Sequence, residues 1–430
     1  MAKKILNLYF QGELAGKLEY ENGKFFFEYD EGYQGKDISN NITKDKSHHT
    51  YDEVKAFFEN LLPEQNIRKH IAKQYGISES NVFMILYHIG GDCAGCIELY
   101  PEDYIYNKQD EFSLKSFLTK YSCLDGNELV DIVKNLIDGY KGIPLDRMSL
   151  AGAQKKLTLI KLRHKVYGIR FFMPMDNFPS NCLIKVTNGR DDGLIYNEHF
   201  CMSLSSKMGF NTAKTTIHKL TEGLEFLSVR RFDRNIRQLG LMVSCSRKHM
   251  QDFCQVFNKE SNVKYQKEGG PAIKDIFFEL EGLDRKRFIQ IIIFNYLIGN
   301  NDAHAKNFSI LESGSFGQDV IYNLAPFYDL VSTNAYDYYE DKMAMKIGGE
   351  YEHNKIRYKH FYKMAKELKL TQRFIDKEIL KISSDIVNVA EQLKKELIDI
   401  GFESDIYDKI IYLIQKNSMT LINSKQYASW

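Results

Sequence analysis

The most constraining feature of this sequence is an apolar helical segment that ends in a dense polar cluster. Residues 288–298 form the most apolar helical pattern in the chain. Directly after it, Asp302, His304, Lys306 and Asn307 fall within six positions. A core-forming helix that ends in such a loop is typical of an active site carried by a rigid scaffold.

The spacing within this cluster points to phosphoryl transfer. Asp302 and Asn307 are five residues apart, and Asp329 follows after another 22 residues. In a protein-kinase catalytic loop, the base Asp and the metal-binding Asn have the same spacing, and a second metal-binding Asp follows. We therefore predict that Asp302 accepts the proton of the substrate hydroxyl, and that Asn307 and Asp329 bind Mg²⁺ through oxygen.

Two basic residues complete the cluster. Lys306 could neutralise charge that develops on the transferred group. His304 fits a structural role, in which its ring nitrogens hold the loop, better than a role as base or ligand. Any one of these residues alone would favour a capped turn with a surface ion pair. Their order behind one apolar helix favours a functional site instead.

A kinase also needs a loop that binds phosphate. Residues 148–156 precede a predicted strand and contain small or polar residues whose backbone N–H groups could approach phosphate closely, namely Ser149, Ala151, Gly152, Ala153, Gln154 and Lys156. The segment matches neither a Walker A motif nor G-x-G-x-x-G. From chemistry alone, an ordinary loop remains open.

Two further segments suggest an ATP site. Lys185 lies in an apolar strand, where an unpaired charge would be unfavourable, and Glu198 on the next helix could pair with it. A lysine that extends to water from a sheet edge is the alternative. In residues 228–234, backbone groups and Phe232 could bind adenine, whereas Asp233 and the neighbouring arginines could simply form an ion-pair network.

Composition narrows the functional class. The chain has 430 residues and a formal net charge of +1, which gives no basis for direct binding to nucleic acid or to a membrane surface. No apolar run reaches the roughly 18 residues of a membrane span. Seven scattered cysteines without a signal peptide predict reduced thiols in the cytoplasm. Cys93 and Cys96 have metal or redox spacing, but small core residues are the favoured interpretation.

The order of patterns predicts an α+β, bilobal fold. Residues 1–145 form a mixed N-terminal region, which begins with a hairpin around Asn22-Gly23 and includes a helix capped by Ser78. Residues 146–235 are rich in strands, and residues 236–430 are helical. A β-rich lobe followed by an all-α lobe is expected to place polar clusters where the lobes meet.

Taken together, these motifs resemble the HipA-type toxin kinases. The resemblance covers nearly the whole chain and rests on an ordered series: Ser149-x-Ala-Gly-Ala-Gln154-x-Lys156, Ile184-Lys185, Asn197-Glu198, Arg231-Phe-Asp-Arg234, Gln251-Asp-x-Cys-Gln255, Val263-Lys-Tyr265, Asp302-x-His-x-Lys-Asn-Phe-Ser309 and Pro326-Phe-Tyr-Asp329. Residues 60–64 and 90–95 also look like the N-terminal subdomain of that family.

The resemblance implies a Ser/Thr protein kinase with a protein-kinase-like fold that uses ATP and Mg²⁺. Asp302 would be the base, Asn307 and Asp329 the metal ligands, and Lys185 a contact of the ATP phosphates. Ser149 matches the autophosphorylation site of the phosphate loop, and its modification would add about two negative charges, repel ATP and inactivate the enzyme. Arg230 departs from the family, which commonly carries an acidic residue there.

Partners and alternatives follow from the same resemblance. Such toxins are bacterial cytoplasmic proteins, are implicated in phosphorylating aminoacyl-tRNA synthetases, and are neutralised by a helix-turn-helix (HipB-like) antitoxin that binds operator DNA. Alternatives are a lipid or small-molecule kinase of the same fold and a non-catalytic co-repressor scaffold. The complete set of Asp302, Asn307 and Asp329 argues against the scaffold, and the lack of a basic amphipathic helix argues against a lipid substrate.

Overall fold

The chain forms two compact units, each assembled from separate stretches of sequence. The computed structural model describes residues 3–107, 111–113, 123–140, 154–164, 168–174, 177–187, 193–239, 242–316 and 319–430. The first unit comprises Met1–Val186, His218–Asn262 and Ile310–Tyr322, and the second comprises Thr187–Ile217, Val263–Ser309 and Asn323–Trp430. The predicted domain limits at residues 145 and 235 remain predictions.

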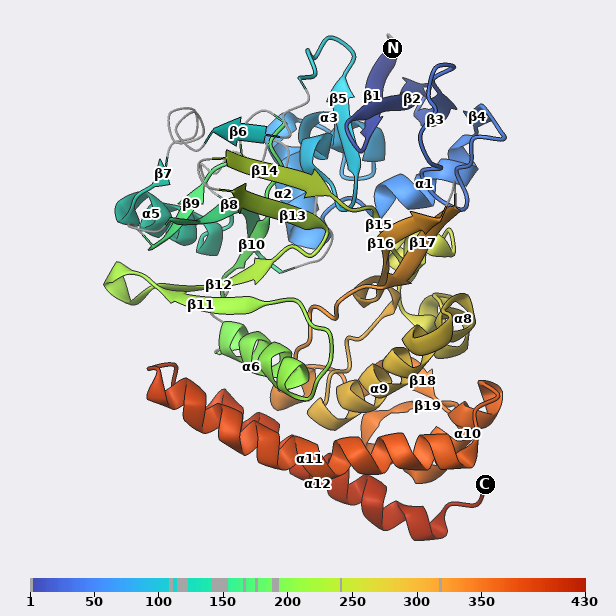
Figure 1. Ribbon diagram of the computed structural model, residues 1–430, viewed down its shortest axis with the longest axis vertical. Coiled ribbons are helices and arrows are strands. Elements are labelled where there is room, and N and C mark those ends of the chain that lie inside the picture. Colours follow the sequence, from blue (N-terminus) through green and yellow to red (C-terminus); the bar gives the residue numbers. More distant parts are fainter. Residues whose placement is uncertain are drawn as a thin grey trace. The chain divides into compact units, whose positions relative to one another are not determined.

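The first unit begins with an antiparallel sheet of order β4-β3-β2-β1-β5 (Figure 1). Its strands are β1 (Lys4–Phe10), β2 (Glu13–Glu21), β3 (Lys24–Tyr29), β4 (His48–His49) and β5 (Ile97–Pro101). Asn22 and Gly23 join β2 to β3 with φ of 51° and 84°, so both adopt the left-handed conformation of a primed two-residue turn. The hairpin predicted there is confirmed.

Three helices accompany this sheet: α1 (Tyr51–Glu59), α2 (Gln65–Tyr75) and α3 (Val82–Ile89). The prediction that a helix starts at Ser78 was wrong. The Ser78 hydroxyl accepts a hydrogen bond from the Ser80 backbone N–H, 3.3 Å away, and so closes a local turn. The Asn81 side chain caps α3 instead, by accepting a bond from the Met84 N–H.

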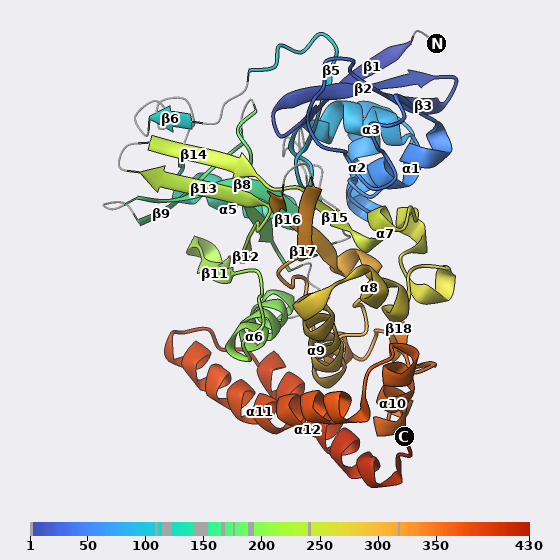
Figure 2. The same cartoon turned by 45° about the vertical axis from the view of Figure 1, so that its right-hand side comes forward.

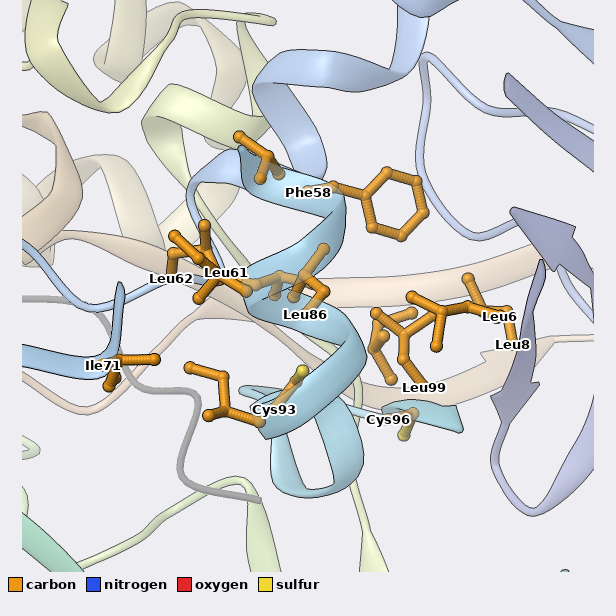
Figure 3. Packing of buried hydrophobic residues seen from close by; sticks show 14 of the residues in the cluster. Leu6, Leu8, Phe58, Leu61, Leu62, Ile71, Leu86, Cys93, Cys96 and Leu99 are labelled. Atoms are coloured by element: carbon orange, nitrogen blue, oxygen red, sulfur yellow. The ribbon is translucent and has the colours of Figure 1, made fainter. Parts of the chain in front are cut away.

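The sheet and its helices enclose a core of packed, buried hydrophobic side chains (Figure 3). Leu6 and Leu8 point to the same face of β1 because side chains alternate along a strand. They pack with Leu86 from α3 and Leu99 from β5, and each of these four is at most 1% exposed. The apolar alternation of the first 30 residues therefore places one face of the sheet in the core.

A second, six-stranded sheet has the order β11-β12-β10-β8-β9-β7, and all of its strands except the first three residues of β11 belong to the first unit. Its strands are β7 (Cys123–Leu124), β8 (Lys156–His164), β9 (Gly168–Phe172), β10 (Cys182–Lys185), β11 (Thr215–Lys219) and β12 (Glu225–Arg230), and helix α5 (Gly126–Ile137) follows β7. Two three-stranded sheets complete the β-rich part. They are β13 (Arg234–Leu239), β14 (Met242–Arg247) and β6 (Glu111–Ser113), and β15 (Met250–Asp252), β16 (Ser309–Phe316) and β17 (Asp319–Leu324). The short helix α7 (Phe253–Val256) comes directly after β15.

The second unit is mainly helical. Its helices are α6 (Leu194–Lys207), α8 (Ile273–Glu279), α9 (Gly282–Ile298), α10 (Tyr358–Glu367), α11 (Gln372–Asp399) and α12 (Ile406–Ser424). Every residue of α9 from Ile291 to Ile298 is buried, as expected for a helix that is apolar on all sides. The long helices α11 and α12 run beside each other and pack on α9 and α6 (Figure 2).

The prediction of an all-α lobe over residues 236–430 needs correction, because strands β14 to β17 lie within that range. The second unit also contains a hairpin of β18 (Lys342–Ile347) and β19 (Glu350–Glu352). Gly348 and Gly349 make its turn with φ of 56° and 90°, a geometry that favours glycine. The α+β fold class is confirmed, with a hairpin inside the helical unit.

Candidate active site

The polar cluster begins where α9 ends. Gly299 closes the helix with φ of 70°, and a Cβ added there would lie 2.9 Å from the Cβ of Asn334. The Asn300 side chain then turns the chain, because its Nδ2 donates to Asn295 Oδ1 (3.1 Å) and its Oδ1 accepts from the Asp302 N–H (3.2 Å). A helix that is fixed by burial thus sets the direction in which the loop leaves it.

The loop from Asp302 to Asn307 is closed by its own hydrogen bonds. The His304 N–H and the Asn307 Nδ2 both donate to the backbone carbonyl of Asp302, at 2.8 and 2.9 Å. Since a carbonyl only accepts, the NH₂ of Asn307 must face Asp302. Its Oδ1 therefore points away from that bond and can serve as a ligand for a hard cation.

A tyrosine distant in sequence holds the predicted base. The phenol of Tyr265 donates to Asp302 Oδ1 at 2.6 Å. Its ring packs edge to face on the His304 ring, with centroids 5.2 Å apart. His304 is buried in this contact, and the role predicted for its ring nitrogens stays a prediction. The sequence analysis did not predict the contact between Tyr265 and Asp302. The two residues are 37 positions apart, and no pattern between them indicates that they meet.

Tyr328 joins the segment of Asp329 to the catalytic loop. Its phenol donates to the Lys306 carbonyl at 2.7 Å and lies 2.6 Å from the Ser309 hydroxyl, which then donates to it. Asp329 itself has φ of 56°, an uncommon conformation for a residue other than glycine. Such strained positions cluster at functional sites.

The predicted functional residues differ in how far they are exposed. Asp302, Asn307 and Asp329 are partly exposed, whereas Lys306 is buried at 5% exposure. The structure thus brings the predicted base and the segments of both predicted metal ligands together in the second unit. Among the described residues, no group of three or more His, Cys, Asp or Glu side chains is placed to hold a metal ion.

Helix α6 is fastened to the segment that follows Asp329. The Asn197 side chain donates from Nδ2 to the Ser332 carbonyl (2.9 Å) and accepts at Oδ1 from the Ser332 N–H (2.8 Å). Asn197, Ser332 and Glu198 are all fully buried. The helix that carries Glu198 therefore has a fixed position relative to the Asp329 segment within the second unit.

The first unit holds a second group of predicted residues. Lys185 on β10 pairs in register with Lys156 on β8, and both are 5% exposed. Residues directly opposite in an antiparallel pair share a face, and like charges there disfavour each other unless an anion compensates them. Gln154 adds a buried Nε2 that has no hydrogen-bond partner among the described residues. Two ammonium groups and an amide donor suit phosphate oxygens.

Several predictions stay untested by this geometry. Ser149, Ala151, Gly152 and Ala153 lie outside the described residues. The pairing of Lys185 with Glu198 remains a prediction, because the two residues belong to different units. Phe232 is half-buried in the first unit, and its contact with adenine also remains a prediction.

The arginines around Phe232 form a buried ion-pair network, which was the alternative interpretation. Arg231 and Arg234 both contact Asp92 (3.3 and 3.0 Å) and Asp233 (2.8 and 2.7 Å), and Arg247 contacts Asp92 at 2.9 Å. Burial alone would raise the pKa of Asp92, but the three guanidinium groups outweigh it and hold that pKa well below its usual range. The network fastens residue 92 of the N-terminal sheet region to the strands around residues 231–247.

Cys93 and Cys96 are core residues, as favoured by the sequence. Both are 0% exposed and neither forms a disulfide with a described residue, and the Cys93 thiol donates to the Gly90 carbonyl at 3.2 Å. Burial raises the pKa of Cys96 to about 12, which leaves it as an unreactive thiol.

Among the helices that the structure describes, none combines the length and the apolar character that a membrane span requires.

Comparison with known proteins agrees with this architecture. Residues 148–392 match the family model of the HipA-like C-terminal domain, and residues 6–100 match that of the HipA N-terminal domain. A Sinorhizobium fredii protein named "Putative kinase Y4mE" is 32% identical over 81% of this chain and 82% of its own length. The "Serine/threonine-protein kinase toxin HipA" of Shewanella oneidensis is 28% identical over 71% of this chain and 69% of its own length.

A solved structure supports the same fold. Shewanella oneidensis HipA, in a complex with HipB and its operator DNA, superposes with a TM-score of 0.78 at 22% identity and covers 97% of both chains. This likeness shows the fold. Together with the match of the C-terminal family model to more than half of the sequence, it leads to one conclusion: the chain belongs to the HipA family.

Proposed function

We propose that this chain is an ATP-dependent Ser/Thr protein kinase. The observation that carries the proposal is the arrangement in the second unit: Asn307 donates to the Asp302 backbone, and Tyr328 joins the loop to the segment of Asp329. These bonds keep the segments of the proposed base and metal ligands together, which supports the kinase interpretation of their spacing. The kinase names of the family relatives support the same conclusion.

The chemistry is transfer of the γ-phosphoryl group of ATP to a protein hydroxyl. The acceptor oxygen bonds to the γ-phosphorus as the bond from that phosphorus to the bridging oxygen breaks, and ADP leaves with the electron pair. The partly exposed Asp302 carboxylate takes the proton of the hydroxyl. Lys306 is the adjacent cation for charge on the transferred group.

The remaining residues bind the nucleotide. Lys156, Lys185 and Gln154 supply donors for phosphate oxygens, and the small residues 151–153 are the proposed phosphate loop. Asn307 and Asp329 offer the hard oxygen ligands that Mg²⁺ prefers, and the ion supplies charge neutralisation on the phosphates when bound. The fully buried Glu198 is the proposed partner of Lys185.

Regulation and partners are proposed from family membership. We infer that Ser149 is an autophosphorylation site whose phosphate switches the enzyme off by repelling ATP. A helix-turn-helix antitoxin is the proposed neutralising partner and would supply the DNA contact that a chain of net charge +1 does not offer by itself. The complex of HipA with HipB and operator DNA supports this partner class. An aminoacyl-tRNA synthetase in the bacterial cytoplasm is the proposed substrate.

Intact-mass analysis after incubation with Mg-ATP tests the proposal. The wild-type chain is expected to gain about 80 Da, which is the mass that one phosphorylation adds. Peptide mapping is expected to place the phosphate on Ser149. Asp302→Asn should gain nothing, because the base is lost. Absence of transfer to the chain itself and to every protein of a bacterial lysate would refute the kinase. Growth inhibition that persists in Asp329→Ala would support the non-catalytic scaffold instead.

A further inference from the structure

The proposed base accepts a hydrogen bond from a residue that lies outside the motif by which the catalytic loop was predicted. Tyr265 donates its phenolic O–H to Asp302 Oδ1 across 2.6 Å. This length is typical of a bond between a hydroxyl and a charged acceptor, which is stronger than a bond between neutral groups. Tyr265 belongs to the segment before helix α8, far in sequence from the loop that it contacts.

We propose that Tyr265 is a positioning residue for Asp302: its O–H fixes one carboxylate oxygen, so that the other faces the acceptor hydroxyl. The inference rests on the proposed kinase function. It assigns to Tyr265 a contribution to the rate of transfer that is separate from nucleotide binding.

The physical reason lies in the freedom of an aspartate side chain. Its terminal torsion has broad, shallow minima, so a carboxylate without a fixed partner samples many orientations. A general base must lie within hydrogen-bond reach of the proton that it removes. A donor on Oδ1 selects one orientation and leaves Oδ2 to accept the proton. The phenol keeps its own proton, since phenols are far weaker acids than carboxylic acids.

Tyr265 can position Asp302 only if it is itself held rigidly, and the catalytic loop holds one side of it. The Ala305 N–H donates to the Lys264 carbonyl at 3.4 Å. The His304 ring packs edge to face on the Tyr265 ring, 5.2 Å away. The tyrosine is therefore bonded and packed against the same loop that carries the carboxylate.

A glycine turn and a strand hold the other side. The Gly270 N–H returns to the Tyr265 carbonyl at 3.0 Å, and a Cβ on Gly270 would lie 2.3 Å from the Val263 carbonyl oxygen, so only glycine fits there. The neighbouring Gln266 accepts from the Lys346 N–H of β18 at 2.8 Å. Supports on several sides of this kind are what a preorganised site requires.

This arrangement also gives the turn at Gly269-Gly270 a structural role. The turn Gly269-Gly270 has no reacting group, but it brings Lys264 and Tyr265 back toward the catalytic loop. Strand β18 completes the connection, since the Ala344 N–H donates to the Asn301 carbonyl at 2.8 Å. Tyr265 and Asp302 thus share a common frame of backbone hydrogen bonds.

The test compares variants by the rate of phosphoryl transfer from radiolabelled Mg-ATP to the chain itself, as a function of ATP concentration. Tyr265→Phe keeps the ring against His304 and removes only the O–H. We expect its maximal rate to fall about 10- to 100-fold, the range for losing a hydrogen bond to a charged group. The ATP concentration at half-maximal rate should stay within about twofold, since nucleotide contacts are untouched.

Two controls separate positioning from packing. Replacing Tyr265 by 3-fluorotyrosine keeps the O–H and should retain the maximal rate within about threefold. Tyr412→Phe removes the same atom from a tyrosine of α12 that is 63% exposed, and should leave both parameters unchanged. Binding of a fluorescent ATP analogue to Tyr265→Phe should match that of wild type.

Three outcomes would overturn the inference. A wild-type maximal rate in Tyr265→Phe would show that the bond does not position the base. A loss of ATP affinity equal to the loss of rate would show a purely structural role. A wild-type chain that transfers no phosphate to itself or to a lysate protein would refute both the kinase function and this inference. An active wild type together with an unchanged maximal rate in Tyr265→Phe would refute the inference alone.

Discussion

Asparagine in place of Asp92 is expected to destabilise the first unit strongly. Asp92 is 1% exposed and accepts hydrogen bonds from Arg231, Arg234 and Arg247 and from the backbone and hydroxyl of Ser180. Asp233 and Glu98 supply the other two carboxylates of the network, so three buried negative charges balance three buried positive ones.

The magnitude follows from this balance. Asp92→Asn keeps the side-chain shape but leaves the network with one uncompensated positive charge, and it turns an NH₂ toward groups that only donate. Removing one partner of a buried ion pair costs about 3–5 kcal/mol of unfolding free energy. A typical protein has about 5–15 kcal/mol in total. The variant is therefore expected to keep the first unit only marginally folded at 37 °C.

Urea denaturation followed by circular dichroism measures this change, and hydrogen exchange of residues 92–100 assigns it to the first unit. Glu222→Gln is the matched control. It makes the same chemical change in a surface ion pair, in which the side chain of Glu222 is 59% exposed and that of Lys134 is 44% exposed. The free energy of unfolding should fall by less than about 1 kcal/mol. Equal losses in the two variants would refute the reasoning that burial makes the Asp92 network essential.

Three further predictions concern local features. Burial lowers the pKa of His249 from 6.5 to about 4. Between pH 7 and pH 4 the unfolded chain therefore binds more protons than the folded chain, and the free energy of unfolding falls by about 3 kcal/mol as the pH drops. His249→Gln should show a smaller difference in the free energy of unfolding between the two pH values. Gly299→Ala should destabilise more than Gly76→Ala in thermal melts, because both have positive φ but only Gly299 has a neighbour within 4 Å. Asn197→Leu should slow autophosphorylation at least about tenfold, because it breaks both bonds to Ser332.

Local patterns of the sequence predicted much of the fold. Asn22-Gly23 predicted its hairpin because few residues tolerate positive φ, and the apolar residues 288–298 predicted a buried helix because no face of them suits water. The start of α3 was missed because Ser78 and Asn81 are both good caps, and hydrogen bonding within the turn decides between them. The hairpin at Gly348-Gly349 was missed because its two strands are short and are followed by helices in the sequence, so they show little alternation of their own.

The candidate site divides in the same way. The sequence by itself predicted Asp302 as the base and Asn307 and Asp329 as the metal ligands, because their order and spacing follow those of a kinase catalytic loop. Only the tertiary structure decided two contacts between segments far apart in the chain: Tyr265 bonds to Asp302 in the second unit, and Lys156 lies opposite Lys185 in the first. Residue spacing encodes groups that act along one loop, whereas contacts across the fold depend on how buried helices and paired strands bring separate segments together.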